Sequence, residues 1–121
     1  MIHNRIVLKS DGRILFIRPD EIIWFEAEGN YIQLHSRKDS VRIRAQLSQV
    51  EERLDPEKFL RINRSAIVNL NFIQEMKPWF RGNYRTVLRN GTELILSRNY
   101  RERLFAQISE PLGIRTLTVA R

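Results

Sequence analysis

Hydrophobic residues recur along most of the chain in short runs that polar or turn-forming residues separate. Runs rich in β-branched and aromatic side chains predict strands. Asp11-Gly12 and Asn90-Gly91 lie between such runs and predict hairpin turns, because Gly tolerates a positive φ. Strands are expected over Arg5–Lys9, Arg13–Ile17, Glu21–Ala27, Tyr31–His35, Val41–Arg44, Phe72–Met76, Tyr84–Arg89 and Glu93–Leu96.

One of these runs has no alternation of apolar and polar residues. Ile22-Ile23-Trp24-Phe25 places four large apolar residues in a row. A short run of this kind predicts a strand that is buried on both faces. Trp24, Phe25 and Phe59 are accordingly expected in the core.

Two segments follow a helical period instead. Apolar residues in 47–54 fall at i, i+3 and i+7, which predicts an amphipathic helix that Asp55-Pro56 stops. Near the C-terminus, Asn99 precedes Glu102 by three residues, as in a capping box that opens a helix. The apolar stripe of this second helix would consist of Tyr100, Leu104, Phe105 and Ile108, and Pro111 and Gly113 would end it.

The order of these elements predicts a mainly β fold with one short internal helix and a C-terminal helix. Regular alternation of strands and helices is missing, which argues against a doubly wound parallel sheet. A length of 121 residues favours a single domain, which we assign to residues 1–110. Residues 111–121 follow no clear pattern and are expected to form a C-terminal tail, for which disorder is one expectation.

Charge narrows the class of partner. The chain has 21 Lys and Arg against 14 Asp and Glu, a net charge of +7 and a pI of about 10.5. Only four of the basic residues are Lys. An Arg-rich excess favours geometric recognition of phosphates and bases, although many Arg residues also lie on plain solvated surfaces.

Several kinds of chemistry are excluded or disfavoured. The absence of Cys excludes disulfides, thiolate catalysis and zinc sites built on Cys. The two histidines, His3 and His35, lack the spacing of a catalytic triad or a metal site. Glu26 and Glu28 are two residues apart but have no third acidic ligand nearby, so we assign them a structural role. We therefore expect no enzymatic activity, no cofactor and no metal.

The sequence also bears on the compartment. No apolar run approaches the roughly 20 residues of a membrane span, and the first residues lack the apolar segment of a secretory signal. We expect a cytoplasmic protein without a membrane partner.

The segment Phe59–Asn69 interleaves apolar anchors with Arg and Asn side chains. This pattern is typical of a loop whose two ends are fixed by buried apolar residues. The Arg and Asn side chains of such a loop can offer hydrogen-bond donors to an anionic partner. The alternative is an ordinary strand–turn–strand with solvated basic residues. Three loops share this combination of polar side chains, which could contact bases, and neighbouring apolar residues, which can be buried in the core. They are Gly29-Asn30-Tyr31, Asn63-Arg64-Ser65 and Ser97-Arg98-Asn99.

Three blocks of the chain, Ile23–Tyr31, Phe59–Asn69 and Gly91–Tyr100, resemble the LytTR-type DNA-binding domain of bacterial transcriptional regulators in order and spacing. The resemblance spans about Arg5 to Phe105. It implies an elongated, mainly antiparallel β fold of small stacked sheets, with loops that enter successive major grooves while the DNA bends. Members usually follow a receiver domain, act as response regulators of two-component systems and commonly bind tandem sites as dimers. A homodimer and a receiver or sensor domain absent from this chain are therefore possible partners beside double-stranded DNA.

Carried over by residue, the resemblance makes Arg64 and Arg98 base readers and gives Arg101 a phosphate contact. Many relatives have His at the position of Asn63. Asn keeps a donor and an acceptor but loses the titratable charge, so the preferred DNA sequence can differ. The complete set of DNA-binding residues that the resemblance implies is Asn30, Tyr31, Asn63, Arg64, Ser65, Arg98 and Arg101.

Two other functions remain open. Single-stranded nucleic acid could stack on exposed aromatic rings, and an edge strand could pair with a partner protein. Trp79 and Phe80, beside Gly82, are the rings expected to be exposed. The candidate stacking platforms are Tyr31, Trp79, Phe80 and Tyr84.

Overall fold

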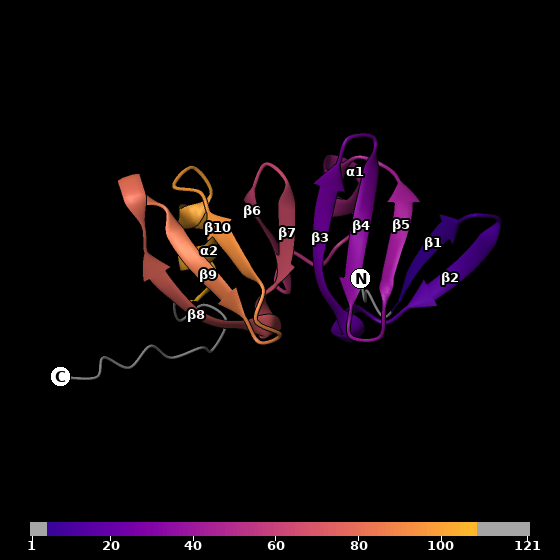
Figure 1. Ribbon diagram of the computed structural model, residues 1–121, viewed down its shortest axis with the longest axis horizontal. Helices are drawn as coiled ribbons and strands as arrows, with labels where there is room; N and C mark the ends of the chain where they lie inside the picture. Colours follow the sequence, from indigo (N-terminus) through magenta and orange to yellow (C-terminus); the bar gives the residue numbers. More distant parts are fainter. Residues whose placement is uncertain (1–4, 109–121) are drawn as a thin grey trace.

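Three antiparallel sheets follow one another along the long axis of the molecule (Figure 1). The computed structural model describes residues 5–108. The central sheet has the strand order β5-β4-β3-β7-β6, a three-stranded sheet of order β10-β9-β8 lies at one end, and the β1–β2 hairpin lies at the other. The strands of the central sheet are β3 (Ile22–Glu28), β4 (Tyr31–Ser36), β5 (Ser40–Arg44), β6 (Phe59–Asn63) and β7 (Ala66–Asn69).

The remaining elements complete the fold that the sequence pattern predicts. The three-stranded sheet consists of β8 (Ile73–Pro78), β9 (Tyr84–Leu88) and β10 (Glu93–Leu96), and the hairpin of β1 (Ile6–Ser10) and β2 (Arg13–Ile17). The helices are α1 (Leu47–Glu51) and α2 (Arg101–Gln107), with 3-10 turns η1 (Pro19–Glu21), η2 (Leu70–Phe72) and η3 (Phe80–Gly82). The mainly β, elongated architecture with an internal and a C-terminal helix is confirmed.

The central sheet is buried on both faces at β3, as its uninterrupted apolar run predicts. Residues 22–25 are each at most 8% exposed. The cluster toward the three-stranded sheet and α2 contains Ile23, Trp24, Leu60, Ile62, Ala66, Val68, Phe72, Leu88, Leu96 and Leu104. The cluster toward α1 and the β1–β2 hairpin contains Ile22, Phe25, Ile32, Leu34, Ile43, Leu47, Leu54, Phe59 and Ile67. Because each fully buried side chain of this size contributes about 1.5–3 kcal/mol, these clusters fix the sheets relative to one another.

Both predicted hairpin turns are present. Asp11 and Gly12 join β1 to β2 with φ of 50° and 76°, and Gly91 has a φ of 91° between β9 and β10. Asn90 Oδ1 accepts a hydrogen bond from Thr92 N at 3.1 Å. In such an Asx turn the Asn side chain binds the backbone two residues on, and Gly supplies the positive φ that the turn requires.

The helix boundaries differ from the sequence-based expectation. α1 ends at Glu51 rather than Leu54, because i→i+3 bonds from Arg53 N to Val50 O and from Leu54 N to Glu51 O tighten the chain there. α2 begins at Arg101, without a side-chain cap, so the predicted capping box of Asn99 and Glu102 is wrong.

A tight turn before α2 explains the second of these errors. Tyr100 N donates to Ser97 O at 2.8 Å, and Tyr100 takes the N-cap position itself. Pro111, Gly113 and the tail 111–121 lie outside the described residues.

The segment Phe59–Asn69 forms strand, turn and strand, which is the alternative that the sequence left open. β6 and β7 pair with Leu60 opposite Val68, and a bulge lies between Arg61 and Asn63. The segment is therefore a β-hairpin inside the sheet and not an extended loop.

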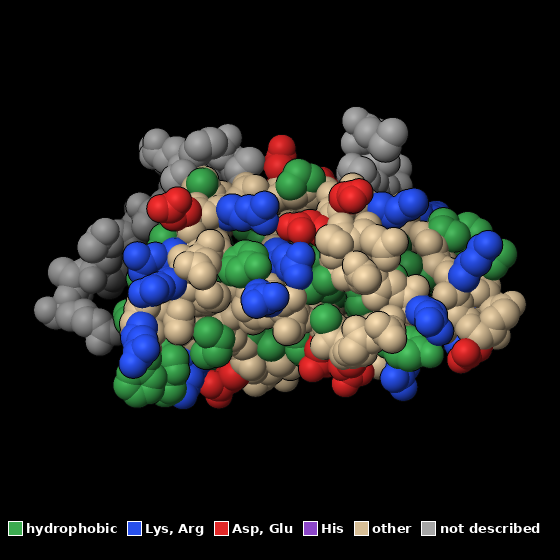
Figure 2. Space-filling model, turned by 90° about the horizontal axis from the view of Figure 1, so that it is seen from above, with side chains coloured by type: hydrophobic (Ala, Val, Ile, Leu, Met, Phe, Trp, Pro, Cys, Tyr) green, Lys and Arg blue, Asp and Glu red, His purple; other side chains and the backbone are tan. Residues whose placement is uncertain are grey.

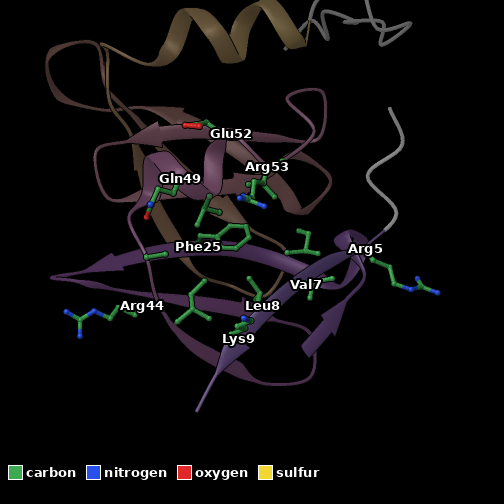
Figure 3. A pocket seen from close by; sticks show the side chains of 14 residues that line it. Arg5, Val7, Leu8, Lys9, Phe25, Arg44, Gln49, Glu52 and Arg53 are labelled. Atoms are coloured by element: carbon green, nitrogen blue, oxygen red, sulfur yellow. The ribbon is translucent and has the colours of Figure 1, made fainter. Parts of the chain in front are cut away.

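A hollow of about 620 Å³ lies where the β1–β2 hairpin approaches β5 and α1 (Figure 3). Its 14 lining residues include Phe25, Lys9 and Arg53, and none of the DNA-binding residues that the resemblance implies. No helix within residues 5–108 is long and apolar enough to cross a membrane.

Candidate nucleic-acid interface

The β3–β4 and β6–β7 turns lie at the same end of the strands of the central sheet, and we call this side of the molecule the edge (Figure 1). β3 and β7 are antiparallel neighbours, with Glu26 opposite Ala66. The pairing continues as Ala27 N donates to Ser65 O at 2.9 Å. The end of β3 thus runs alongside the β6–β7 turn, and the β3–β4 turn follows directly.

The segment after β10 joins this edge from the three-stranded sheet. Ser97 N donates to Ile62 O at 2.8 Å, and Asn63 Nδ2 donates to Ile95 O at 2.8 Å. These two bonds connect β6 to β10 across the junction of the sheets. The three loops that the sequence singled out therefore occupy one edge of the molecule, and Arg64 and Arg98 both lie on it.

The guanidinium groups of Arg64 and Arg98 are exposed and have no protein partner within residues 5–108. Most other Arg side chains near the edge are engaged: Arg61 and Arg103 contact Glu51, and Arg85 contacts Glu93. Figure 2 looks onto this edge and shows Lys and Arg side chains along its whole length. Arg64 and Arg98 are thus available to a ligand at this surface.

Arg61 builds the β6–β7 turn. Its Nε donates to Asn63 O at 3.3 Å and its Nη2 donates to Arg64 O at 2.7 Å. Its Nη1 lies 3.6 Å from Glu51 Oε1, which connects the turn to α1. The guanidinium fork therefore fixes the backbone on which Arg64 is mounted. This role could not be predicted from the sequence, because it depends on the geometry of the β6–β7 turn and on Glu51 of α1 lying beside it.

Two Asn side chains stabilise this edge by hydrogen bonds to the backbone. Asn63 Nδ2 binds Ile95 O, and its Oδ1 accepts from Ser65 N at 2.7 Å. Asn83 Oδ1 accepts from Arg98 N at 2.9 Å. Both atoms of the Asn63 amide are thus engaged within the protein, and the role of Asn83 was missed from the sequence.

The first loop presents one exposed and one partly covered residue. Asn30 is exposed at the tip of the β3–β4 turn. The ring of Tyr31 is half-buried, with Arg42 Cζ 4.3 Å and Arg44 Cζ 5.9 Å from its centroid. Stacked cations of this kind fix the ring and add positive charge beside the turn.

Arg101, expected to contact phosphate, is half-buried at the start of α2. Its Nη1 donates to Gly82 O at 3.1 Å and so holds the β8–β9 loop against α2. Gly82 has a φ of 83°, which favours Gly, and a Cβ at this position would lie 3.0 Å from the Nη1 atom, so the guanidinium would have to shift.

Glu26 and His35 form a contact with each other. His35 Nε2 lies 2.9 Å from Glu26 Oε1, and the imidazole stacks on Trp24 with ring centroids 4.5 Å apart. Glu28 is exposed at the end of β3. Within residues 5–108 no group of three or more His, Cys, Asp or Glu side chains could hold a metal ion.

The aromatic side chains divide as the sequence predicts. Trp24, Phe25 and Phe59 are buried, whereas Trp79 and Phe80 are 42% and 70% exposed. Of the other candidate stacking platforms, Tyr84 is half-buried against Phe105 with ring centroids 5.4 Å apart, which removes its ring as an open platform.

A rigid β scaffold that presents unpaired Arg and exposed Asn side chains from turns on one edge is suited to bind nucleic acid. The family model of the LytTr DNA-binding domain matches residues 12–109, from the β1–β2 turn onward. The chain therefore belongs to the LytTR family of DNA-binding domains.

Individual relatives agree with this assignment. The chain is 26% identical over 101 residues to the sensory transduction protein LytT of Bacillus subtilis, covering 84% of the chain and 42% of the relative. It is 29% identical over 101 residues to the transcriptional regulatory protein LytR of Staphylococcus aureus, covering 84% of the chain and 41% of the relative. The chain thus spans about two fifths of the length of these curated relatives.

A solved structure shares the fold. The LytTr DNA-binding domain of a putative methyl-accepting/DNA response regulator from Bacillus cereus superposes with a TM-score of 0.76 at 21% identity. The match covers 92% of this chain and 98% of that one.

Proposed function

We propose that this domain binds double-stranded DNA in a sequence-specific manner to regulate transcription, and that its three turns enter successive major grooves on one side of the duplex. The observation that carries the proposal is the common edge on which the free guanidinium groups of Arg64 and Arg98 lie. An Arg fork pairs bidentately with O6 and N7 of guanine in the major groove. The net charge of +7 supports the affinity for the phosphate backbone.

The residues have different roles in this proposal. Arg64 and Arg98 read bases, Asn30 and Tyr31 contact a neighbouring groove, and Arg101 meets a phosphate with the part of its guanidinium that Gly82 leaves free. Asn63 acts through the protein, because its amide is engaged on both sides, and Ser65 follows it in the same turn.

The longer protein is proposed on the strength of its relatives. The curated relatives extend well beyond the matched region and are named as sensory transduction and transcriptional regulatory proteins. We propose a bacterial, cytoplasmic response regulator in which a receiver or sensor domain controls this domain and two copies bind tandem sites. The domain itself would act by binding and without catalysis.

Selection from random duplexes at near-physiological salt tests the proposal. An enriched motif is expected for the wild-type protein, and the double variant R64A/R98A is expected to enrich none while retaining non-specific affinity. A preference for single strands would contradict the proposal and favour stacking on exposed rings. Capture of a protein partner without any nucleic-acid affinity would instead favour pairing through an edge strand.

A further inference from the structure

The β8–β9 loop exposes two adjacent aromatic rings. Phe80 is 70% and Trp79 42% exposed, and their rings meet edge to face with centroids 4.9 Å apart. Exposing an apolar surface of this kind to water costs free energy. A contiguous exposed apolar patch therefore marks a site at which a protein contacts a partner. Neither ring has a role in the three-turn interface.

The loop holds these rings in place. Trp79 N donates to Asn83 O at 2.8 Å, and Asn83 N donates to Phe80 O at 3.0 Å. Arg81 adopts a φ of 56°, which is unusual for a residue other than Gly and persists only where the surroundings enforce it. The aromatic pair is therefore presented in a defined position.

The loop also adjoins a predicted base reader. Asn83 Oδ1 accepts a hydrogen bond from Arg98 N, and a Cβ on Gly82 would lie 3.5 Å from Arg98 Cβ. β8 ends and β9 begins at the same sheet edge where β10 ends, since Pro78 and Leu96 both lie opposite Tyr84. The aromatic loop thus continues the candidate interface past Arg98, away from the β3–β4 turn.

Positive charge accompanies the rings. Arg81 is exposed and has no ion-pair partner within residues 5–108. Arg85 Cζ lies 4.0 Å from the centroid of Trp79, while its Nε lies 3.2 Å from Glu93 Oε1. A cation beside an apolar wedge matches the chemistry of a duplex, in which phosphates flank sugars and base edges.

We infer that the β8–β9 loop is an additional duplex-contact site that flanks the three-turn interface, with Arg81 on a backbone phosphate and Phe80 against the sugars and base edges of the adjacent minor groove. This inference rests on the proposed function and deepens it. The contact would lengthen the site on the side of Arg98 and would favour base steps that open easily.

Two duplexes separate this contact from the rest. Both carry the selected motif; the short one ends at the base pair that Arg98 protects in a footprint, and the long one continues for about one helical turn, roughly 10 base pairs, on that side. The wild-type protein is expected to bind the long duplex more tightly. Phe80→Ala should lose about fivefold in affinity for the long duplex, as burial of part of a Phe ring predicts, and nothing for the short one.

Phe16→Ala is the matched control. Phe16 is 67% exposed on β2, at the opposite end of the molecule, and its loss should leave the affinity for both duplexes unchanged. Arg81→Ala should lower the salt slope by about 0.9 on the long duplex alone.

Equal effects of Phe80→Ala on both duplexes, or no effect on either, would overturn the inference while the three-turn site stands. Weaker binding of a single-stranded oligonucleotide by Phe80→Ala, with the long duplex unaffected, would overturn it in favour of base stacking. Failure of the wild-type protein to distinguish the motif from random duplex would instead overturn the proposed function, and the inference with it.

Discussion

The side chain of Asn63 bridges the two larger sheets: its Nδ2 donates to the backbone oxygen of Ile95 at 2.8 Å. The same amide accepts a hydrogen bond from Ser65 N, so one side chain fixes both the β6–β7 turn and its distance from β10. The spacing between Arg64 and Arg98 therefore depends on a residue that need not touch DNA.

Asn63→Ala is expected to lower the free energy of unfolding by about 1–2 kcal/mol, because two hydrogen bonds are lost. It should also weaken binding of the selected motif more than binding of random duplex, since Arg64 is no longer held. Urea unfolding and fluorescence anisotropy measure the two effects.

Asn90→Ala controls for the loss of a turn. Asn90 Oδ1 accepts from Thr92 N in the β9–β10 turn, at the end of the three-stranded sheet that lies away from the interface. This variant should lose stability and keep its affinity for DNA. If Asn63→Ala kept full stability and altered the preference at one base pair only, Asn63 would be a direct base reader.

Arg98 and Arg101 are expected to differ in what their removal does. Arg98→Ala should lose roughly 1–3 kcal/mol of discrimination at one base position, because a bidentate contact carries that much. Arg101→Ala should weaken all duplexes about equally and lower the salt slope by about 1. Titrations of single-base variants of the motif at several salt concentrations distinguish the two.

Arg13→Ala provides the control for charge alone. Arg13 is exposed on β2, far from the interface. Its removal should change neither the motif nor the salt slope appreciably. An unchanged motif in Arg98→Ala would show that the base-reading role has been given to the wrong residue.

Outside residues 59–69, the sequence predicted the strands well because their signals are local. Asp11-Gly12 and Asn90-Gly91 force tight turns wherever they occur between β-prone runs, and the run Ile22–Phe25 is too apolar for a surface strand. The resemblance to the LytTR family implied that the three loops act together in one DNA interface. Their adjacency in space follows from the pairing of β3 with β7, which no local pattern encodes.

The supporting contacts could not be predicted for the same reason. Asn63 reaches Ile95 across 32 positions of the chain. The predicted capping box is absent because Tyr100, and not Asn99, takes the N-cap position after a turn in which Tyr100 N donates to Ser97 O. Local sequence propensity was enough to predict the strands and turns. The contacts that stabilise the interface join residues far apart in the chain and could not be predicted in this way.

Arg61→Lys is expected to loosen the β6–β7 turn although the charge is kept. Lys lacks the fork with which Arg61 binds Asn63 O, Arg64 O and Glu51 together. The free energy of unfolding should fall by about 1–3 kcal/mol, as expected when hydrogen bonds to a charged group are lost. The specificity for the motif should fall while the salt slope stays the same.

Arg103→Lys tests whether Glu51 alone explains the effect. Arg103 Nη1 lies 3.1 Å from Glu51 Oε2 but does not touch the turn, and its side chain is 59% exposed. An exposed pair of this kind contributes at most about 1 kcal/mol, and its change should leave specificity intact. Equal loss of specificity in both variants would assign the role to Glu51 rather than to the fork of Arg61.

Thr86→Val is expected to stabilise the domain. Thr86 is fully buried on β9, the middle strand of its sheet, and its Oγ1 has no hydrogen-bond partner within residues 5–108. A buried hydroxyl without a partner costs about 1–3 kcal/mol, and Val has nearly the same shape and favours strands. The free energy of unfolding should rise by about 1 kcal/mol in urea titrations, with DNA binding unchanged. Thr92→Val, at a half-buried position beside the exposed residues of the β9–β10 turn, should change the free energy of unfolding by less than about 0.5 kcal/mol. A loss of stability in Thr86→Val would mean that the hydroxyl is hydrogen-bonded in solution and contributes to the packing between the sheets.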